Sequence, residues 1–325
     1  NYNILIELIM IMKPKIVQIG VGKFGLNHFK TLMKLDEKKI IDFIGIVDKD
    51  IDILSKIKKC SNISTSTDVK DFLNVADGFD VVTPPQLHYD MVKKLLNSNK
   101  HVFVEKPLSL NFKDSYKLAC LSKKNKQTLQ VGHIFRYNST ITELKKILER
   151  KPNRPTYVKA NFLQDRIPRH NNGAIFVYMH GFDILDYLFN LEPKKIFAMA
   201  NIKKFSPMRE INSTINIQYR NINAFLNVGW IPTGVQRRLD FFSDKRHLIC
   251  DLLTNQISIY ENGKLLKKLT VIQKDEPLFL ELKDFSKCIK ENSTPKVDGF
   301  IGSKIVKICE LATKSISQNT IVDFN

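Results

Sequence analysis

A glycine-rich turn directly after an apolar run is the feature that most limits how this chain can fold. Residues 15–20, KIVQIG, read as a buried strand. Three glycines at GxGxxG spacing follow: Gly20, Gly22 and Gly25. The first glycine permits a tight turn, the second lets backbone approach a pyrophosphate, and the third lets a helix pack on the strand. We expect the helix N-terminus, at Lys23 and Phe24, to point its free amides at phosphates.

The next apolar run supports a dinucleotide site, which the glycine turn alone would indicate only weakly. Residues 41–48, IDFIGIVD, end in Asp48, 23 residues after Gly25. An acid at this place hydrogen-bonds the ribose hydroxyls of the adenosine and repels a 2′-phosphate, which favours NAD over NADP. Lys49 weakens this preference, and the alternative is that Asp48 is a simple turn residue.

Two further predicted strands carry polar residues at their C-terminal ends, where open α/β sheets bind ligands. The first, FDVVTPPQLH, contributes Thr83, Pro84 and His88, and the second, HVFVEKPLSL, contributes Glu105 and Lys106. We predict that all five contact the cofactor. A surface ion pair is the usual explanation for such a Glu–Lys, but the proline after Lys106 restricts its backbone at the crevice. Together the four runs predict a doubly wound parallel sheet.

Composition excludes several classes of protein. A chain of 325 residues is long enough for two domains, and its five cysteines contain no CxxC pair, which suits a reducing cytoplasm. The net charge of +18 invites a nucleic-acid interpretation, but the lysines are scattered and no nucleic-acid-binding motif is present. The histidines lack metal-ligand spacing, so we predict no metal site. The apolar residues 1–11 are too short to span a bilayer and read as an N-terminal extension.

At this point the sequence resembles the glucose–fructose oxidoreductase and inositol dehydrogenase family, Gfo/Idh/MocA. The matching pieces are GVGKFG, IVDKD, TPPQLH and above all EKPLSL. The resemblance implies a Rossmann NAD-binding domain, placed at residues 12–131, and an α/β domain with an open, mainly antiparallel sheet at residues 132–325. It also implies a homodimer or homotetramer. Alternating runs in the second half fit strands, and residues 277–289 and 300–316 fit amphipathic helices.

Three stretches resemble the branch of that family that oxidises the 3-hydroxyl of a UDP-sugar: VGHIFRYN, DRIPRHNNGAIFVYMHGFDIL and GWIPTGVQRRL. A diphosphate needs cationic partners, and every arginine lies between Arg136 and Arg246. We therefore expect the substrate side to include Arg136, Asn138, Arg166 and Arg169, with Arg237 and Arg238 as further candidates. Structural salt bridges or surface positions are the alternative for each arginine.

The catalytic prediction rests on Lys106 and His180. The resemblance implies that the histidine of MHGFD meets substrate above the nicotinamide, usually with a carboxylate four residues earlier. Here that position is Phe176, so the carboxylate is absent. Asp183, which we also expect on the substrate side, lies on the same predicted helical face as His180 and is a candidate to orient its imidazole. A neutral imidazole suits the base that removes a hydroxyl proton, and Lys106 would stabilise the developing charge on oxygen. The alternative is a histidine in an apolar core.

Two other functions compete with a UDP-sugar dehydrogenase. One is a reductase or dehydrogenase of the same family that acts on another polyol or keto-sugar. The other is a catalytically silent NAD-binding regulator, which the missing carboxylate favours and the intact EKP motif opposes. Both alternatives keep the fold and the cofactor. The first differs from a UDP-sugar dehydrogenase in the substrate side, and the second differs in lacking catalysis.

Overall fold

A computed structural model of the chain describes residues 13–165, 173–203, 209–232 and 234–325. The chain forms two compact units, each assembled from two segments. The first unit contains the residues up to Ile134 together with Asp275–Val306, and the second contains Phe135–Lys274 and Lys307–Asn325. Within the described ranges, no helix is both long and apolar enough to cross a membrane.

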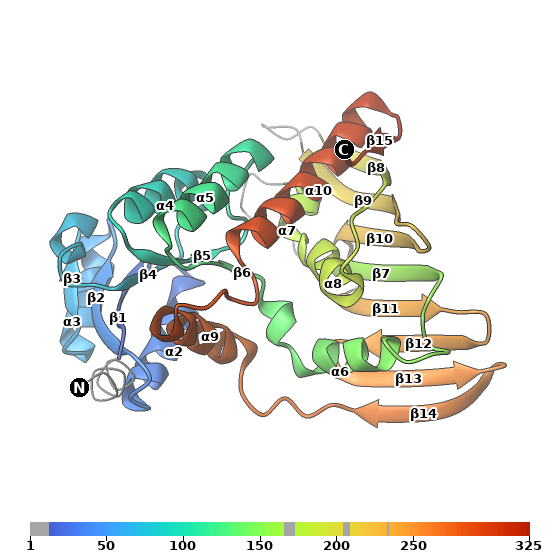
Figure 1. Cartoon of the computed structure of the whole chain (residues 1–325), viewed down its shortest axis with the longest axis horizontal. Helices are drawn as coiled ribbons and strands as arrows, with labels where there is room; N and C mark the ends of the chain where they lie inside the picture. Colours follow the sequence, from blue (N-terminus) through green and yellow to red (C-terminus); the bar gives the residue numbers. More distant parts are fainter. Residues whose placement is uncertain (1–12, 166–172, 204–208, 233) are drawn as a thin grey trace. The chain divides into compact units, whose positions relative to one another are not determined.

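The first unit is built on a six-stranded sheet whose neighbouring strands are all parallel (Figure 1). Its order is β3-β2-β1-β4-β5-β6. Nearly every residue of the central strands is buried, as expected for a parallel sheet that is covered on both faces. The strands are β1 (Lys15–Ile19), β2 (Asp42–Val47), β3 (Ser64–Ser66), β4 (Gly78–Val81), β5 (His101–Glu105) and β6 (Leu129–Gly132).

The helices of this unit follow the strands in alternation. They are α2 (Gly25–Glu37), α3 (Ile51–Cys60), α4 (His88–Asn97) and α5 (Phe112–Asn125), with short 3₁₀ turns at Val69–Phe72, Pro85–Leu87 and Ile134–Tyr137. A later helix, α9 (Pro277–Glu291), lies beside α2 (Figure 1) and shares its apolar cluster. The ring of Phe285 in α9 is edge-on to Phe103 of β5 at 6.0 Å. Helix α10 (Gly299–Gln318) begins in the first unit and ends in the second.

The second unit is built on a nine-stranded sheet in the order β14-β13-β12-β11-β7-β10-β9-β8-β15 (Figure 1). Only the β7–β10 pair is parallel. Buried and exposed residues alternate along β7 and β10, so one face of the sheet is packed and the other is open. The strands are β7 (Tyr157–Gln164), β8 (Lys195–Lys203), β9 (Arg209–Gln218), β10 (Asn223–Trp230), β11 (Gln236–Phe242), β12 (Arg246–Asp251), β13 (Gln256–Glu261), β14 (Lys264–Thr270) and β15 (Val322–Asp323).

Besides the end of α10, the described part of the second unit contains α6 (Ser139–Leu148), α7 (Ala174–Val177) and α8 (His180–Phe189). Helix α8 packs closely on the sheet at Gly181, where a Cβ would lie 2.9 Å from Leu226 and 3.2 Å from Phe162. Because these contacts belong to β10 and β7, they bring the start of α8 against the middle of the sheet.

The predicted fold class is confirmed: a Rossmann sheet followed by a mainly antiparallel sheet with helices. The division of the chain differs from the predicted boundary at residues 131 and 132, because residues 275–306 pack with the first unit. Four strands were not predicted: β3, β12, β14 and β15. β14 at the sheet edge is exposed along nearly its whole length and shows no alternation. The proposed extension, residues 1–11, lies outside the described residues.

Candidate active site

The glycine turn has the geometry that its sequence predicts. Gly20 has φ of +95°, a conformation that favours glycine, and a Cβ there would lie 2.6 Å from the Val82 carbonyl oxygen. A Cβ on Gly25 would lie 2.4 Å from the Gly20 oxygen, so the turn and α2 are in close contact. The buried Gln18 side chain of β1 donates to the carbonyls of Gly20 and Gly25, at 2.9 and 2.7 Å. These contacts of Gln18 were not predicted from the sequence.

Asp48 lies just after β2 and is tied to the glycine turn. Its Oδ2 accepts the Val21 amide at 2.6 Å, and its Oδ1 accepts the Asp50 amide at 3.0 Å. Each carboxylate oxygen has a further lone pair, so Asp48 retains the capacity to accept ribose hydroxyls. The contact with Val21 also places this carboxylate beside the turn, as a dinucleotide that bridges β1 and β2 requires.

His88 joins the two polar loops that follow β4 and β5. Its Nε2 lies 2.8 Å from the Thr83 carbonyl oxygen, and its Nδ1 lies 2.7 Å from that of Pro107. The imidazole is buried, and burial lowers its pKa. Both ring nitrogens of His88 contact backbone carbonyl oxygens. The structure therefore favours a bridge between the loops over the predicted direct contact of His88 with cofactor.

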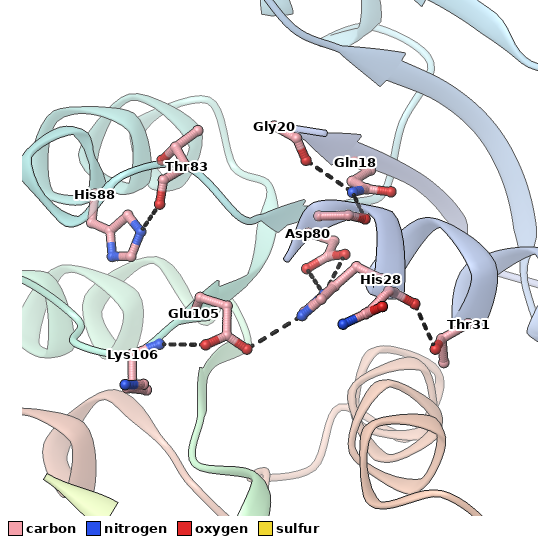
Figure 2. A network of polar contacts seen from close by, with 11 residues as sticks. Gln18, Gly20, His28, Thr31, Asp80, Thr83, His88, Glu105 and Lys106 are labelled. Atoms are coloured by element: carbon pink, nitrogen blue, oxygen red, sulfur yellow. Dashed lines mark hydrogen bonds and ion pairs between the residues drawn. The ribbon is translucent and has the colours of Figure 1, made fainter. Parts of the chain in front are cut away.

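A buried polar chain lies behind Lys106 (Figure 2). The Nδ1 of His28, from α2, lies 3.0 and 3.1 Å from the two oxygens of Asp80 in β4. Its Nε2 lies 3.3 Å from Oε1 of Glu105, whose Oε2 accepts the Lys106 backbone amide at 3.2 Å. Glu105 therefore faces the protein interior, which does not favour its predicted contact with cofactor. Neither His28 nor Asp80 was identified from the sequence. His28 lies in a helix and Asp80 interrupts an apolar strand, and neither residue belongs to a motif that would have pointed to it.

The ends of β1, β2, β4 and β5 fit a bound dinucleotide. A Cβ on Gly22 would have no neighbour within 4 Å, so backbone there is open to a close-packed phosphate group. The Oγ1 of Thr83 is a buried hydroxyl without a hydrogen-bond partner among the described residues, and it is free to meet a ligand. Gly20, Gly22, Asp48, Thr83 and Lys106 all follow the carboxyl ends of these strands, the edge at which such sheets bind nucleotides. No metal-binding group of three or more His, Cys, Asp or Glu side chains occurs in the described part of the chain.

In the second unit, His180 is the first residue of α8 and is half-buried. Its ring lies edge-on to Phe135 at 5.0 Å, and the Arg237 guanidinium lies 5.8 Å from the same Phe135 ring. Tyr178, two residues before His180, packs on Trp230 and its hydroxyl lies 3.3 Å from Gln164 Oε1. Burial raises the pKa of Tyr178 to about 12, so the phenol is protonated at neutral pH. Phe135, Tyr178 and Trp230 are aromatic neighbours that the sequence did not single out.

Arg136 and Asp183, both predicted on the substrate side, are buried together. The Nε of Arg136 donates to Asp183 Oδ1 and its Nη2 donates to Asp186 Oδ2, both at 2.7 Å. The guanidinium also lies 5.5 Å from the Tyr187 ring, and its side chain is only 5% exposed. The structure therefore does not favour Arg136 as a phosphate ligand, because two carboxylates already neutralise it. The prediction that Asp183 orients the His180 imidazole stays a prediction.

The remaining substrate candidates differ in their surroundings. The Asn138 side chain caps α6 by accepting the amides of Thr140 and Ile141, which does not favour its use by substrate. Arg238 forms a two-pronged ion pair with Asp240, at 2.7 and 2.8 Å. The two arginines on which the diphosphate prediction chiefly rested, Arg166 and Arg169, lie outside the described residues.

The fold and the turn geometry together define a class of protein. A parallel sheet in this strand order, with a glycine turn after the central strand and an acid after its neighbour, is a dinucleotide-binding domain. Consistent with this, residues 15–133 match the family model described as "Oxidoreductase family, NAD-binding Rossmann fold".

Known proteins extend the likeness over nearly the whole chain. UDP-N-acetylglucosamine 3-dehydrogenase of Acidithiobacillus ferrooxidans is 22% identical over 89% of this chain and 92% of its own length. Its solved structure superposes with a TM-score of 0.84 at 21% identity, covering 94% of this chain and 99% of that one. Myo-inositol 2-dehydrogenase of Thermotoga maritima is 24% identical over 94% of this chain and 96% of its own.

A second solved structure contains a cofactor. It is an oxidoreductase from Agrobacterium radiobacter in complex with NAD+, L-tartaric acid and magnesium, with a TM-score of 0.83 at 16% identity over 96% of this chain and 99% of that one. The solved structures show the fold. With the family match over residues 15–133, they show that the first unit contains an NAD(P)-binding Rossmann domain of the Gfo/Idh/MocA type, and over nearly its whole length the chain is similar to oxidoreductases of that kind.

Proposed function

We propose that this protein is an NAD-dependent dehydrogenase that oxidises a carbinol of a sugar, with a UDP-sugar as the preferred substrate class and its 3-position as the site of oxidation. The observation that carries this proposal is the placement of Lys106. It follows β5 directly, at the sheet edge that carries the glycine turn, and its backbone amide is held by Glu105. A cationic side chain at that edge is suited to a substrate hydroxyl near the nicotinamide.

The proposed chemistry divides between cofactor and protein. Bound NAD+ would accept the hydride from the carbinol carbon. The hydroxyl proton passes to the His180 imidazole, and the Lys106 ammonium stabilises the negative charge that develops on the oxygen as the carbonyl forms. Asp48 favours NAD over NADP because its carboxylate would repel a 2′-phosphate. Arg166 and Arg169 are proposed partners of the diphosphate, and Arg237, close to the Phe135 ring that His180 contacts, is a third.

The likeness to both a UDP-sugar dehydrogenase and an inositol dehydrogenase sets the substrate panel. The purified protein is incubated with NAD+ or NADP+ and either UDP-N-acetylglucosamine or myo-inositol, and absorbance at 340 nm is followed. We expect turnover with the UDP-sugar and NAD+. Turnover with myo-inositol alone would reassign the substrate class, and NADH binding without any turnover would favour a silent NAD-binding regulator.

The catalytic residues are tested on whichever substrate is active. His180→Ala is expected to lower kcat by about 10²- to 10⁴-fold, the contribution of a general base. Lys106→Ala should cause a loss of about 10²-fold or more, typical of removing a charge-stabilising donor. Lys113→Ala, which removes an exposed lysine of the same unit, is the matched control. Near-wild-type turnover in both test variants would refute the assignment.

The diphosphate partners are tested by binding. Arg166→Ala combined with Arg169→Ala should weaken the binding of UDP, measured by calorimetry, while the affinity for NADH is retained. An unchanged affinity for UDP would remove both arginines from the substrate side.

A further inference from the structure

A carboxylate lies in the middle of the Rossmann core, at a strand position where an apolar residue is expected. Asp80 is completely buried in β4, next to Phe79 and Val81, which are also fully buried. Burying a carboxylate is costly unless it is paired, and an apolar residue at such a place usually serves the fold as well or better. Its presence therefore needs an explanation beyond packing.

The partner of Asp80 is His28, which is also fully buried. Two carboxylates face the imidazole from separate strands: Asp80 of β4 at Nδ1 and Glu105 of β5 at Nε2 (Figure 2). The other ring contacts, Phe24 and Phe103, are apolar. Burial alone would lower the pKa of His28, but Asp80 and Glu105 raise it to about 10. Burial raises the pKa of Asp80 as well, and we place the shared proton on the imidazole because carboxylates flank it on both sides.

The polar chain ends at Lys106. Glu105 uses one oxygen toward His28 and the other toward the Lys106 backbone amide. The carboxylate lies against Gly132 of β6, where a Cβ would be 2.7 Å from its Oε1, so glycine at that position leaves room for it. In this arrangement Glu105 contacts His28, the Lys106 amide and Gly132 together, and it holds the backbone from which the Lys106 side chain extends.

We propose that Asp80 is a positioning residue that acts through His28 to hold the Glu105 carboxylate, and through Glu105 the backbone of Lys106. The proposal rests on the proposed function for the role of Lys106 in catalysis. Asp80 is fully buried, so its expected effect on Lys106 passes through its neighbours. It keeps the imidazole cationic, and the cation keeps the carboxylate next to Lys106 in place. A neutral imidazole would hold Glu105 more weakly, because it lacks the charge that attracts the carboxylate.

The test compares Asp80→Asn with the wild-type protein and with Asp77→Asn. Asp80→Asn removes one negative charge with little change of shape. Asp77, on the same sheet at the amino end of β4, is exposed and accepts the Lys15 amide, so Asp77→Asn removes a similar charge away from Lys106. Two readouts need no substrate: titration of the His28 imidazole by NMR, and hydrogen exchange of the Lys106 backbone amide.

In wild type and Asp77→Asn, His28 is expected to stay protonated throughout pH 6 to 9, consistent with its raised pKa. In Asp80→Asn it should lose its proton within or below that range, and exchange of the Lys106 amide should become about tenfold faster or more. Unchanged titration and exchange in Asp80→Asn would overturn the proposal.

Activity is an independent readout, because replacing a residue with a purely structural role would leave kcat and its pH dependence unchanged. With NAD+ and UDP-N-acetylglucosamine, Asp80→Asn should lower kcat by about 10- to 100-fold, as expected from a misplaced catalytic group, with little change in KM for NAD+. Its kcat should also fall as pH rises through the lowered pKa of His28, a loss that the wild type lacks. Equal kcat and an equal pH profile in the two proteins would refute the proposal.

A second variant guards against simple misfolding. Asp80→Leu combined with His28→Leu replaces the buried ion pair with apolar groups, a change that is often neutral for stability. It should retain the thermal midpoint yet show the fast Lys106 exchange and the lowered kcat. Slow, wild-type exchange in this double variant would overturn the proposal. If the wild type oxidises neither substrate, the proposed function fails, whereas the His28 titration and Lys106 exchange still decide whether Asp80 positions that backbone.

Discussion

The buried ion pair of the second unit gives the sharpest test of how that unit is held together. Arg136 donates to Asp183 and Asp186 at 2.7 Å each, and all three side chains are at most 5% exposed. Arg136→Met keeps the apolar stem but removes the cation. Breaking a buried pair by removing one partner costs about 3–5 kcal/mol, because the remaining charges are left uncompensated.

This loss is large enough to measure by two methods. For units of roughly 150–250 residues, 1 kcal/mol shifts Tm by about 2–4 °C, so Arg136→Met should lower the Tm of the second unit by roughly 10 °C. Scanning calorimetry gives the shift, and urea unfolding gives the free energy. Arg238→Met is the matched control: its guanidinium also pairs with a carboxylate, but its side chain is 47% exposed, so the loss should stay below about 1 kcal/mol.

A compensating variant separates charge from packing. Adding Asp183→Leu and Asp186→Leu to Arg136→Met removes the stranded carboxylates and should recover much of the lost stability. A loss under about 1 kcal/mol in Arg136→Met, or a triple variant no more stable than the single one, would show that the buried pair does not hold this unit together. Weakened UDP binding by an Arg136→Met protein of unchanged stability would restore Arg136 to the substrate side.

Three further predictions concern the first unit. Gly25→Ala should abolish measurable NADH binding in a fluorescence titration, because the added Cβ would lie 2.4 Å from the Gly20 oxygen and would force the turn open. A Kd within about twofold of the wild-type value, a difference in binding free energy of about 0.4 kcal/mol, would contradict this prediction. Phe285→Ala should lower the free energy of urea unfolding by about 3–5 kcal/mol, since it empties a buried site against Phe103, and a loss under about 1 kcal/mol would show that α9 is not anchored there. His28 has a raised pKa in the folded protein, so its stabilising contribution is complete below its unfolded pKa near 6.5 and is lost as pH rises through about 10. Wild type should therefore lose more stability than His28→Gln between pH 6 and pH 10 in urea unfolding, and parallel curves would contradict the assignment.

Local patterns were enough to predict the nucleotide-binding half. The turn at Gly20 and Gly25 depends on backbone conformation and close contact, which glycine spacing encodes directly. The apolar runs that became β1, β4 and β5 have lengths and compositions typical of buried parallel strands, and their order along the chain limits the topology. Asp48 was predicted to contact the cofactor for the same reason, because that prediction depends on its position at the end of a strand.

Side-chain roles in the second unit were harder to predict, because they depend on which residues meet. Arg136 looked like a phosphate ligand by residue type, yet the fold buries it between Asp183 and Asp186, 47 and 50 residues further along the chain. The side-chain oxygen of Asn138 caps α6, a local role that its position just before a helix could have revealed. Phe135 meets His180 only because the fold brings two distant segments together.

By itself, the sequence determined the class of the fold, the cofactor turn and the identity of Lys106 as the residue after β5. These features follow from backbone geometry and from hydrophobic periodicity, which are local along the chain. Only the tertiary structure decided that α9 packs with the first unit and that His28 joins Asp80 to Glu105. The physical reason is that the role of a buried charge depends on its partners. Those partners come from strands and helices that are brought together only when the chain folds.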